Sequence, residues 1–175
     1  NLPRRLGEHI LLRELALSRM STLYLARQGM DPLEGPFTVV KTLHPTLAEQ
    51  QHFADRFVAE AELLTELRHR HVVRGLGWSN NDGVLSMALE FLEGASLAEI
   101  MEVCTPEMTP PFEIWAGLFA RASRGLHALH QYRGEKGDPA NLVHRDVTPG
   151  NIFVTWNGRV VILDLGLARQ AGHTP

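Results

Sequence analysis

The sequence predicts an α+β fold made of two lobes that join near residue 93. The first part alternates short strand-like stretches with one long amphipathic helix, and the second part is helical and ends in a hairpin. The 175 residues suffice for one moderate domain or two small lobes. A hydrophobic content of 44% can supply a core, and a charged content of 21% suits a hydrated surface.

The first lobe is predicted from residue patterns between 10 and 91. Residues 10–28, ILLRELALSRMSTLYLARQ, are compatible with two strands joined by a turn or with one helix, because alternation and propensity disagree. The β-branched stretch 36–43, PFTVVKTL, predicts a strand. Residues 47–68 predict an amphipathic helix built from strong helix formers. Strands near 72–78 and 84–91 follow, joined by the turn NNDG.

The second lobe is predicted to begin after a short polar break, EGAS, at 93–96. Helices are expected near 97–103 and 112–131, and the polar stretch 133–141, RGEKGDPAN, is expected to be a loop. Residues 142–166 predict a strand, a loop, a strand, a turn and a strand. An Asn-Gly pair in this stretch is a strong hairpin signal.

Composition narrows the class of protein. The formal net charge of −3 gives no broad basic face, so we expect no binding to nucleic acid. Cys104 is the single cysteine, which excludes an internal disulfide and fits a reducing, cytoplasmic location. No apolar run is long enough to span a bilayer, so we expect no membrane contact within this sequence. The first residue is Asn and no element closes the sequence, so we expect a fragment whose full protein is compatible with a membrane anchor elsewhere.

Two carboxylates and a carboxamide form a candidate metal and phosphate site. Asn151 follows Asp146 in the stretch HRDVTPGNIF (144–153), and Asp164 ends the apolar strand VVIL. A hairpin between Asn151 and Asp164 brings the two close together, and their oxygen atoms suit Mg²⁺ when phosphates complete its shell. Asp146 then stands beside the metal, where it can orient a hydroxyl nucleophile for phosphoryl transfer.

Lys41 is a second candidate because it ends the apolar strand TVVK, where an ammonium group needs an anionic partner. Glu60 lies in the following predicted helix, on the side that faces back toward the strand. A Lys41–Glu60 pair would hold the ammonium toward the phosphates of a nucleotide.

These motifs, in this order, resemble those of the eukaryotic-type protein kinase family, in its bacterial serine/threonine branch. VVK is similar to the strand that carries the ATP-binding lysine, and RFVAEAELLTELRH is similar to the helix with the paired glutamate. HRDVTPGN is similar to the catalytic loop, DLG to the metal-binding D-F-G, and MALEFLEGASL to the last N-lobe strand and hinge. The insert before HRDV and the hydroxyl residue after it resemble myxobacterial kinases. The resemblance covers residues 10–169.

The resemblance implies a two-lobed protein kinase-like fold, with residues 1–92 as the N-lobe and 93–175 as the start of a truncated C-lobe. It implies ATP and Mg²⁺ as cofactors, and a protein whose Ser or Thr hydroxyl accepts the γ-phosphate in bacterial signalling. Because the sequence has no counterpart of the later C-lobe, we expect the isolated 175 residues to be poorly stable or prone to aggregation.

The resemblance also implies roles for single residues. Asp146 is the implied catalytic base, and Asn151 and Asp164 are the implied Mg²⁺ ligands. Lys41, held by Glu60, is the implied partner of the α- and β-phosphates. The implied adenine site consists of the gatekeeper Leu89, the backbone of Glu90 and Leu92, and the apolar side chains of Leu23, Val39 and Phe153.

The sequence departs from the family pattern at the lid over the phosphates and in the catalytic loop. The three glycine positions of the lid fall on Ala16, Ser18 and Ser21, so we expect weaker ATP binding or a looser lid. Thr148 stands where serine/threonine kinases usually have a lysine that contacts the transferred phosphate. Arg145, next to the catalytic aspartate, implies control by phosphorylation of the activation loop.

Three functions therefore stay open. The first is a serine/threonine protein kinase, the second is a pseudokinase that serves as a binding or scaffold module, and the third is a small-molecule phosphotransferase of the same fold. His127, His130 and His144 have spacings that also occur in zinc sites, but we expect structural roles for them. Thr174, before a proline, is a candidate phosphorylation site.

Overall fold

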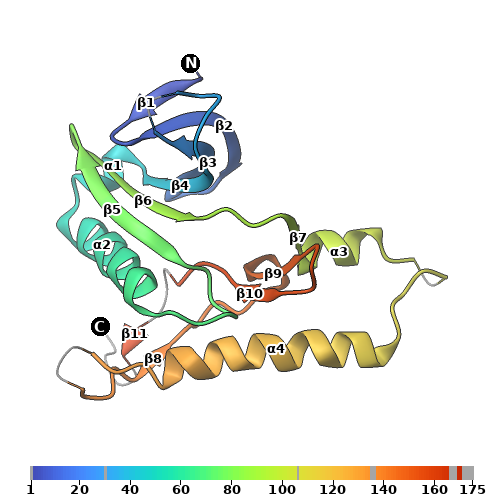
Figure 1. Cartoon of the computed structure of the whole chain (residues 1–175). Coiled ribbons are helices and arrows are strands. Elements are labelled where there is room, and N and C mark those ends of the chain that lie inside the picture. The colour runs from blue at the N-terminus through green and yellow to red at the C-terminus, as the bar shows by residue number, and fades with distance from the viewer. Residues whose placement is uncertain (1, 30, 106, 135–136, 166–168, 171–175) are drawn as a thin grey trace. The chain divides into compact units, whose positions relative to one another are not determined.

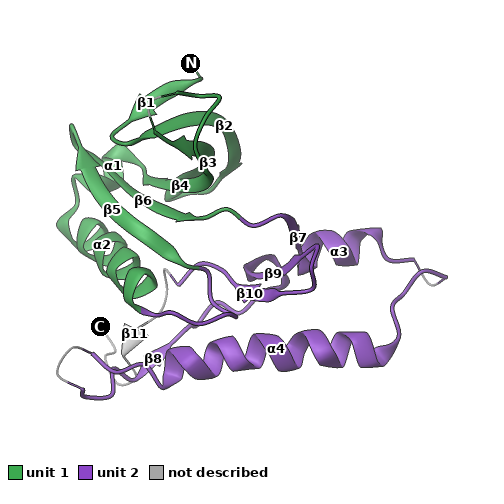
Figure 2. Ribbon diagram, viewed as in Figure 1, with its two compact units in different colours: residues 1–66, 74–91 green, residues 67–73, 92–175 purple. Residues whose placement is uncertain are grey.

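The computed structural model divides into two compact units, which are described here one at a time. Unit 1 consists of residues 1–66 and 74–91, and unit 2 consists of residues 67–73 and 92–175 (Figure 2). The candidate phosphorylation site Thr174 and the glycine of the DLG motif lie outside the residues that the structure describes. Those residues are 2–29, 31–105, 107–134, 137–165 and 169–170.

Unit 1 is built on a six-stranded antiparallel sheet with the order β1-β2-β3-β4-β6-β5. Figure 1 shows that this sheet is strongly curved and that helix α2 lies along β5. The strands are β1 (Arg4–Leu6), β2 (His9–Leu17), β3 (Ser21–Gln28), β4 (Phe37–Leu43), β5 (Gly75–Asn81) and β6 (Val84–Glu90).

Residues 10–28, which the sequence left open, form the hairpin of β2 and β3 rather than a helix. Both strands have a second neighbour, since β2 also pairs with β1 and β3 also pairs with β4. Pairing on both sides outweighs the helix propensity of the Leu, Arg and Glu residues, because strand preference is set mainly by the surroundings. The strand predicted for 36–43 is confirmed as β4.

One face of the sheet carries the core of unit 1. The side chains of Leu6, Leu11, Ala26 and Val40 form a buried cluster on this face. Successive residues of a strand point to opposite faces, so Lys41 points away from the cluster that contains Val40. Helix α2 packs on the face that carries Lys41, as the ion pair described below shows.

The helix predicted for 47–68 is interrupted in the structure. A short helix α1 (Pro45–Ala48) precedes α2 (Gln51–Glu66), so the long helix begins later and ends earlier than predicted. Proline at the first helical position sets the backbone angle of α1 and sacrifices no hydrogen bond there. The buried stripe of α2 has helical spacing and consists of Phe57, Glu60, Ala61 and Leu64.

The described part of unit 2 contains two α-helices, one 3-10 helix and two small sheets (Figure 1). Strands β10, β9 and β7 form one sheet in that order, and β11 pairs with β8 in the other. The helices α3 and α4 confirm the two predicted near 97–103 and 112–131. The elements are β7 (Gly94–Ser96), α3 (Leu97–Val103), α4 (Phe112–His130), β8 (Leu142–Val143), the 3-10 helix η1 (Pro149–Asn151), β9 (Ile152–Thr155), β10 (Val160–Ile162) and β11 (Arg169–Gln170).

The prediction of a polar break at 93–96 is wrong for residues 94–96, because they form β7, which pairs with β9. The glycine at position 94 allows β7 to approach β9 closely, because a Cβ atom at this position would collide with the Val154 carbonyl oxygen. Ser96 then caps α3, because its hydroxyl accepts a hydrogen bond from the Glu99 N–H and the Glu99 side chain accepts one from the Ser96 N–H. The Ser96 hydroxyl also donates to the Glu99 carboxylate at 2.7 Å, and this hydrogen bond, together with the one from the Ser96 N–H, holds the pKa of Glu99 below its usual value.

Residues 67–73 belong to unit 2 because they bind to the end of β10. The Nδ1–H of His71 donates to the Val160 carbonyl at 2.7 Å, and the Ile162 N–H donates to the His71 carbonyl at 2.9 Å. Helix α4 approaches the same carbonyl at Gly125, where a Cβ atom would collide with the oxygen. The strand predicted near 72–78 therefore begins at residue 75, as β5.

Among the residues that the structure describes, no helix is both long enough and apolar enough to cross a membrane.

Candidate active site

The first part of the candidate site is a buried ion pair in unit 1. The Nζ atom of Lys41 donates to both carboxylate oxygens of Glu60, at 3.0 and 3.2 Å. The two side chains are 11% and 6% exposed, so both charges are largely removed from water. A buried ammonium group requires such a partner, because desolvation of an unpaired charge costs several kcal/mol. The predicted contact between Lys41 and Glu60 is present, and its role toward a nucleotide stays a prediction.

Three of the predicted adenine-site residues share a sheet face with Lys41. Leu23 of β3 lies directly opposite Lys41, and Val39 lies two residues before Lys41 on β4. Leu89 of β6 lies directly opposite Val39. Because directly opposed residues and residues two apart point to the same face, all four side chains are neighbours on one surface. Leu23, Val39 and Leu89 are each only partly buried, so this apolar surface is accessible within unit 1.

The main chain of the predicted hinge is partly engaged. The Glu90 N–H donates to the Arg74 carbonyl at 2.9 Å, and the Glu90 carboxylate accepts from the Arg74 N–H at 2.9 Å. Any adenine contact from the Glu90 main chain therefore comes from its carbonyl oxygen. Leu92 follows in the segment between β6 and β7 and is partly buried.

The predicted lid is the turn between β2 and β3, and a serine closes it. The Ser18 hydroxyl accepts hydrogen bonds from the N–H groups of Ser21 at 3.0 Å and Met20 at 3.3 Å. The same hydroxyl lies 3.0 Å from the Ser21 carbonyl oxygen. Ala16 lies at the end of β2, opposite Leu23. None of the positions Ala16, Ser18 and Ser21 has a positive φ, so this turn does not need glycine for its own geometry.

In unit 2, the predicted catalytic loop is tied to the end of β10 by His144. The imidazole is buried, with 1% of its surface exposed. Its Nε2–H donates to the Leu163 carbonyl at 3.2 Å, and its Nδ1 accepts from the Asp146 N–H at 3.3 Å. Both bonds fit the same neutral tautomer. The sequence analysis expected a structural role for His144, and these contacts fit such a role.

The loop brings the carboxylate and carboxamide groups together. The Nδ2–H₂ group of Asn151 donates to the Asp146 carbonyl at 2.9 Å and to the Asp146 carboxylate at 3.1 Å. The Asn151 carbonyl in turn accepts from the Leu163 N–H at 2.9 Å, which places Asp164 next to the same contact. Arg145 and Asp164 both have positive φ, 65° and 52°, an uncommon conformation for residues other than glycine. Strained backbone of this kind concentrates at functional sites.

The donor atoms of this loop fit a magnesium ion. The Asn151 amide nitrogen is turned toward Asp146, so the amide offers its oxygen to a cation. Asp164 contributes an exposed carboxylate at the end of β10. Carboxylate and amide oxygens are ligands that Mg²⁺ accepts together with phosphate oxygens. Zinc sites usually include nitrogen or sulfur ligands, and this pair supplies oxygen atoms alone.

Two further predicted residues have exposed side chains in unit 2. Thr148 precedes η1, and its carbonyl accepts from the Asn151 N–H at 3.0 Å, while its side chain points to solvent. Arg145 is also exposed, as a residue that captures a phosphate group must be. Phe153 lies in β9 and is partly buried beside Gly94 of β7.

Comparison with known proteins supports the sequence resemblance. The family described as "Protein kinase domain" matches residues 25–175. The tyrosine-protein kinase MasK of Myxococcus xanthus is 31% identical over 93% of this chain and 25% of MasK. The serine/threonine-protein kinase pkn2 of Myxococcus xanthus is 32% identical over 93% of this chain and 18% of pkn2. The chain thus spans about a quarter or less of these relatives.

Solved structures show the same fold. The crystal structure of the Mycobacterium tuberculosis PknI kinase domain matches with a TM-score of 0.71 and 28% identity, over 96% of this chain and 63% of that one. The apo form of PpkA-294 matches with a TM-score of 0.75 over 94% of this chain and 60% of that one. At 20% sequence identity, this match shows a shared fold and nothing about activity. The predicted α+β, protein kinase-like fold is confirmed.

Proposed function

Because the chain belongs to the protein kinase family, we propose that it carries the nucleotide-binding and catalytic-loop residues of an ATP-dependent serine/threonine protein kinase. The observation that carries this proposal is the loop in which His144 holds Asp146 and Asn151 beside the end of β10. Phosphoryl transfer depends mainly on positioning and on charge neutralisation, and this loop supplies fixed oxygen atoms for both.

Unit 1 contributes the nucleotide-binding side chains in this proposal. Lys41 directs its ammonium group at the α- and β-phosphates while Glu60 fixes its position. The partly exposed side chains of Leu23, Val39 and Leu89 contact the adenine ring. Further adenine contacts come from the Glu90 carbonyl, the Leu92 main chain and Phe153.

Unit 2 contributes the groups that act on the transferred phosphate and on the acceptor. Asn151 and Asp164 hold Mg²⁺, which neutralises phosphate charge when it is bound. Asp146 accepts the proton of the attacking hydroxyl or orients that hydroxyl, since its carboxylate lies at the loop surface and is fixed by Asn151. Thr148 offers a hydroxyl but no charge at the position where a lysine is usual. By analogy with the loss of a hydrogen-bond donor to the transition state, we expect phosphate transfer about 10²-fold slower than with lysine at this position.

The acceptor and setting are also part of the proposal. We propose Ser and Thr hydroxyls of proteins as acceptors, because pkn2, PknI and several other relatives are named serine/threonine-protein kinases. MasK is named a tyrosine-protein kinase, so the phosphorylated residue must be identified directly. Bacterial signalling in the cytoplasm, under control of a phosphate that Arg145 binds, completes the proposal.

The test is autophosphorylation of the full-length protein from labelled Mg-ATP, followed by identification of the phosphorylated amino acid. Asp146→Asn removes the proton acceptor and Lys41→Met removes the phosphate contact, so both variants should abolish transfer. Gln131→Leu, at an exposed position after α4, is the matched control and should retain wild-type transfer. Transfer that persists in Asp146→Asn would contradict the proposed role of the loop.

A pseudokinase is the second candidate, and two observations favour it. The Ser18 hydroxyl accepts hydrogen bonds from N–H groups of its own turn, so these groups are not free for phosphate. Position 148 of the catalytic loop is a threonine where serine/threonine kinases usually have a lysine. This candidate predicts a folded protein that binds ATP or a protein partner without transferring phosphate. Binding of Mg-ATP with no labelled product, in a protein that unfolds cooperatively, would support it over the kinase.

A further inference from the structure

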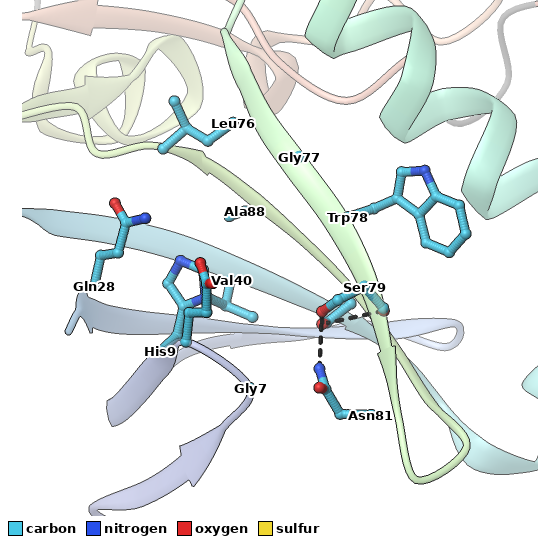
Figure 3. Close-up of a pocket in the computed structure, with 12 residues that line it drawn as sticks. Gly7, His9, Gln28, Val40, Leu76, Gly77, Trp78, Ser79, Asn81 and Ala88 are labelled. Carbon is cyan, nitrogen blue, oxygen red and sulfur yellow. Dashed lines mark hydrogen bonds between the residues drawn. The ribbon is translucent and has the colours of Figure 1, made fainter. Parts of the chain in front are cut away.

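Unit 1 contains a cavity of about 410 Å³ (Figure 3). Its floor consists of the buried residues Val40, Ser86 and Ala88. Val40 and Lys41 are consecutive residues of β4 and therefore point to opposite faces. The cavity is thus separate from the surface that we propose for the nucleotide, and its volume is in the range of small-molecule sites.

One wall of the cavity carries two polar side chains, the partly buried His9 and the solvent-exposed Gln28. His9 of β2 and Gln28 of β3 lie directly opposite each other, and Figure 3 shows both on the same side of the cavity. Within the described part of the chain, neither side chain forms a hydrogen bond. Burial lowers the pKa of His9, so the ring is neutral near pH 7 and offers one donor and one acceptor.

The other wall carries a chain of hydrogen bonds. The Asn81 side chain donates to the Ser79 hydroxyl at 2.8 Å, and the Ser79 and Ser86 hydroxyls lie 3.1 Å apart (Figure 3). Ser79 and Asn81 belong to β5, which is the last strand of the sheet and therefore has one unpaired edge, and Ser86 connects them to the floor. A bulge leaves Leu76 without an opposite residue, and next to it a Cβ atom at Gly77 would meet nothing within 4 Å. The main chain at Gly77 therefore borders the cavity without a side chain to cover it.

The charge of the lining disfavours anionic ligands. Glu8 is the charged residue of the lining, which includes no Lys or Arg. A phosphate or carboxylate would meet a negative charge and no cationic partner, whereas an uncharged ligand meets donors and acceptors on both walls. The apolar floor at Val40 and Ala88 provides a place for a small aliphatic group.

We propose that this cavity is a second ligand site, specific for an uncharged peptide-type molecule that pairs its amide groups with His9, Gln28 and the β5 wall. The inference is independent of the kinase proposal, because binding is measured without phosphate transfer.

The test is a titration of the full-length protein with N-acetyl-leucinamide, followed by saturation-transfer difference NMR. Binding should persist in the presence of Mg-ATP, because the cavity and Lys41 lie on opposite faces. N-acetyl-leucine, which adds a carboxylate to the same scaffold, should bind roughly tenfold more weakly, as expected for an unpaired anion.

Two variants locate the site. Gln28→Leu and His9→Leu remove polar groups at similar size, and each should weaken binding of N-acetyl-leucinamide about fivefold to tenfold. Gln131→Leu makes the same chemical change in unit 2 and should leave the affinity unchanged. Absence of binding to the wild-type protein would overturn the proposal, and so would unchanged affinity in both cavity variants.

Discussion

Replacing Ser18 by alanine should strengthen ATP binding although it removes hydrogen bonds from the protein. The hydroxyl accepts from the N–H groups of Met20 and Ser21 and lies within donating distance of the Ser21 carbonyl. In a lid that covers phosphates, main-chain N–H groups are the donors available to phosphate oxygens. The serine therefore competes with the nucleotide for the same donors.

The size of the effect follows from these contacts. The turn is partly exposed, so each hydrogen bond contributes about 0.5 kcal/mol, the low end of the usual range. Loss of all three lowers the free energy of unfolding by about 1.5 kcal/mol. ATP has to displace the hydroxyl from two N–H groups, so removing the hydroxyl favours binding by about 1 kcal/mol, or roughly fivefold.

Calorimetric titration of the full-length protein with Mg-ATP and with adenosine measures this effect. Ser18→Ala should bind Mg-ATP roughly fivefold more tightly and adenosine with unchanged affinity, since adenosine has no phosphates. Ser123→Ala, at an exposed position of α4, is the matched control. Weaker Mg-ATP binding by Ser18→Ala would show that the hydroxyl contacts the phosphates itself, and an equal change for both ligands would show that the lid does not act through phosphate.

Three further predictions concern stability, measured by urea unfolding. Gly125→Ala should destabilise the protein by about 1–3 kcal/mol, because a Cβ atom collides with the carbonyl that faces α4, whereas Gly117→Ala on the same helix should stabilise it by up to about 1 kcal/mol. Equal effects of the two would contradict this packing. Lys41→Met should cost about 3–5 kcal/mol by leaving a buried carboxylate unpaired, and adding Glu60→Leu should recover most of the loss. Failure of the double variant to recover would argue against a buried pair. Ser96→Ala should cost about 1 kcal/mol through loss of the α3 cap, and no change would mean that the cap is dispensable.

The fold was predictable from the sequence wherever local pattern and tertiary surroundings agree. The strand at 36–43 and the helices near 97–103 and 112–131 have clear periodicity or terminal signals, and the structure contains all three. Residues 10–28 stayed ambiguous because their partners in the sheet, not their propensities, decide between strand and helix. Residues 93–96 were misassigned because small polar residues indicate a break unless a glycine lets another strand approach.

The candidate site was predictable to a similar degree. The Lys41–Glu60 pair followed from a cation at the end of an apolar strand, a rule that depends only on desolvation. The turn between β2 and β3 was one of the two alternatives for residues 10–28, but the hydrogen bonds by which Ser18 closes it were not predicted, although two serines three residues apart are a recognisable turn signal. The cavity at His9 and Gln28 was also beyond sequence reasoning, since it depends on the register of β2 against β3 and on the curvature of the sheet.

The attachment of residues 67–73 to the end of β10 has a consequence for biosynthesis. His71 leaves the ribosome 89 residues before Val160, the residue that accepts its hydrogen bond. At usual rates of translation this interval lasts about 5 to 20 seconds. Throughout that time the His71 imidazole lacks the carbonyl that accepts its hydrogen bond, and the strands of unit 1 that follow residue 73 are synthesised in the meantime. Unit 2 is therefore discontinuous along the chain, and an expression fragment that begins at residue 92 would lack the segment that fills its own core.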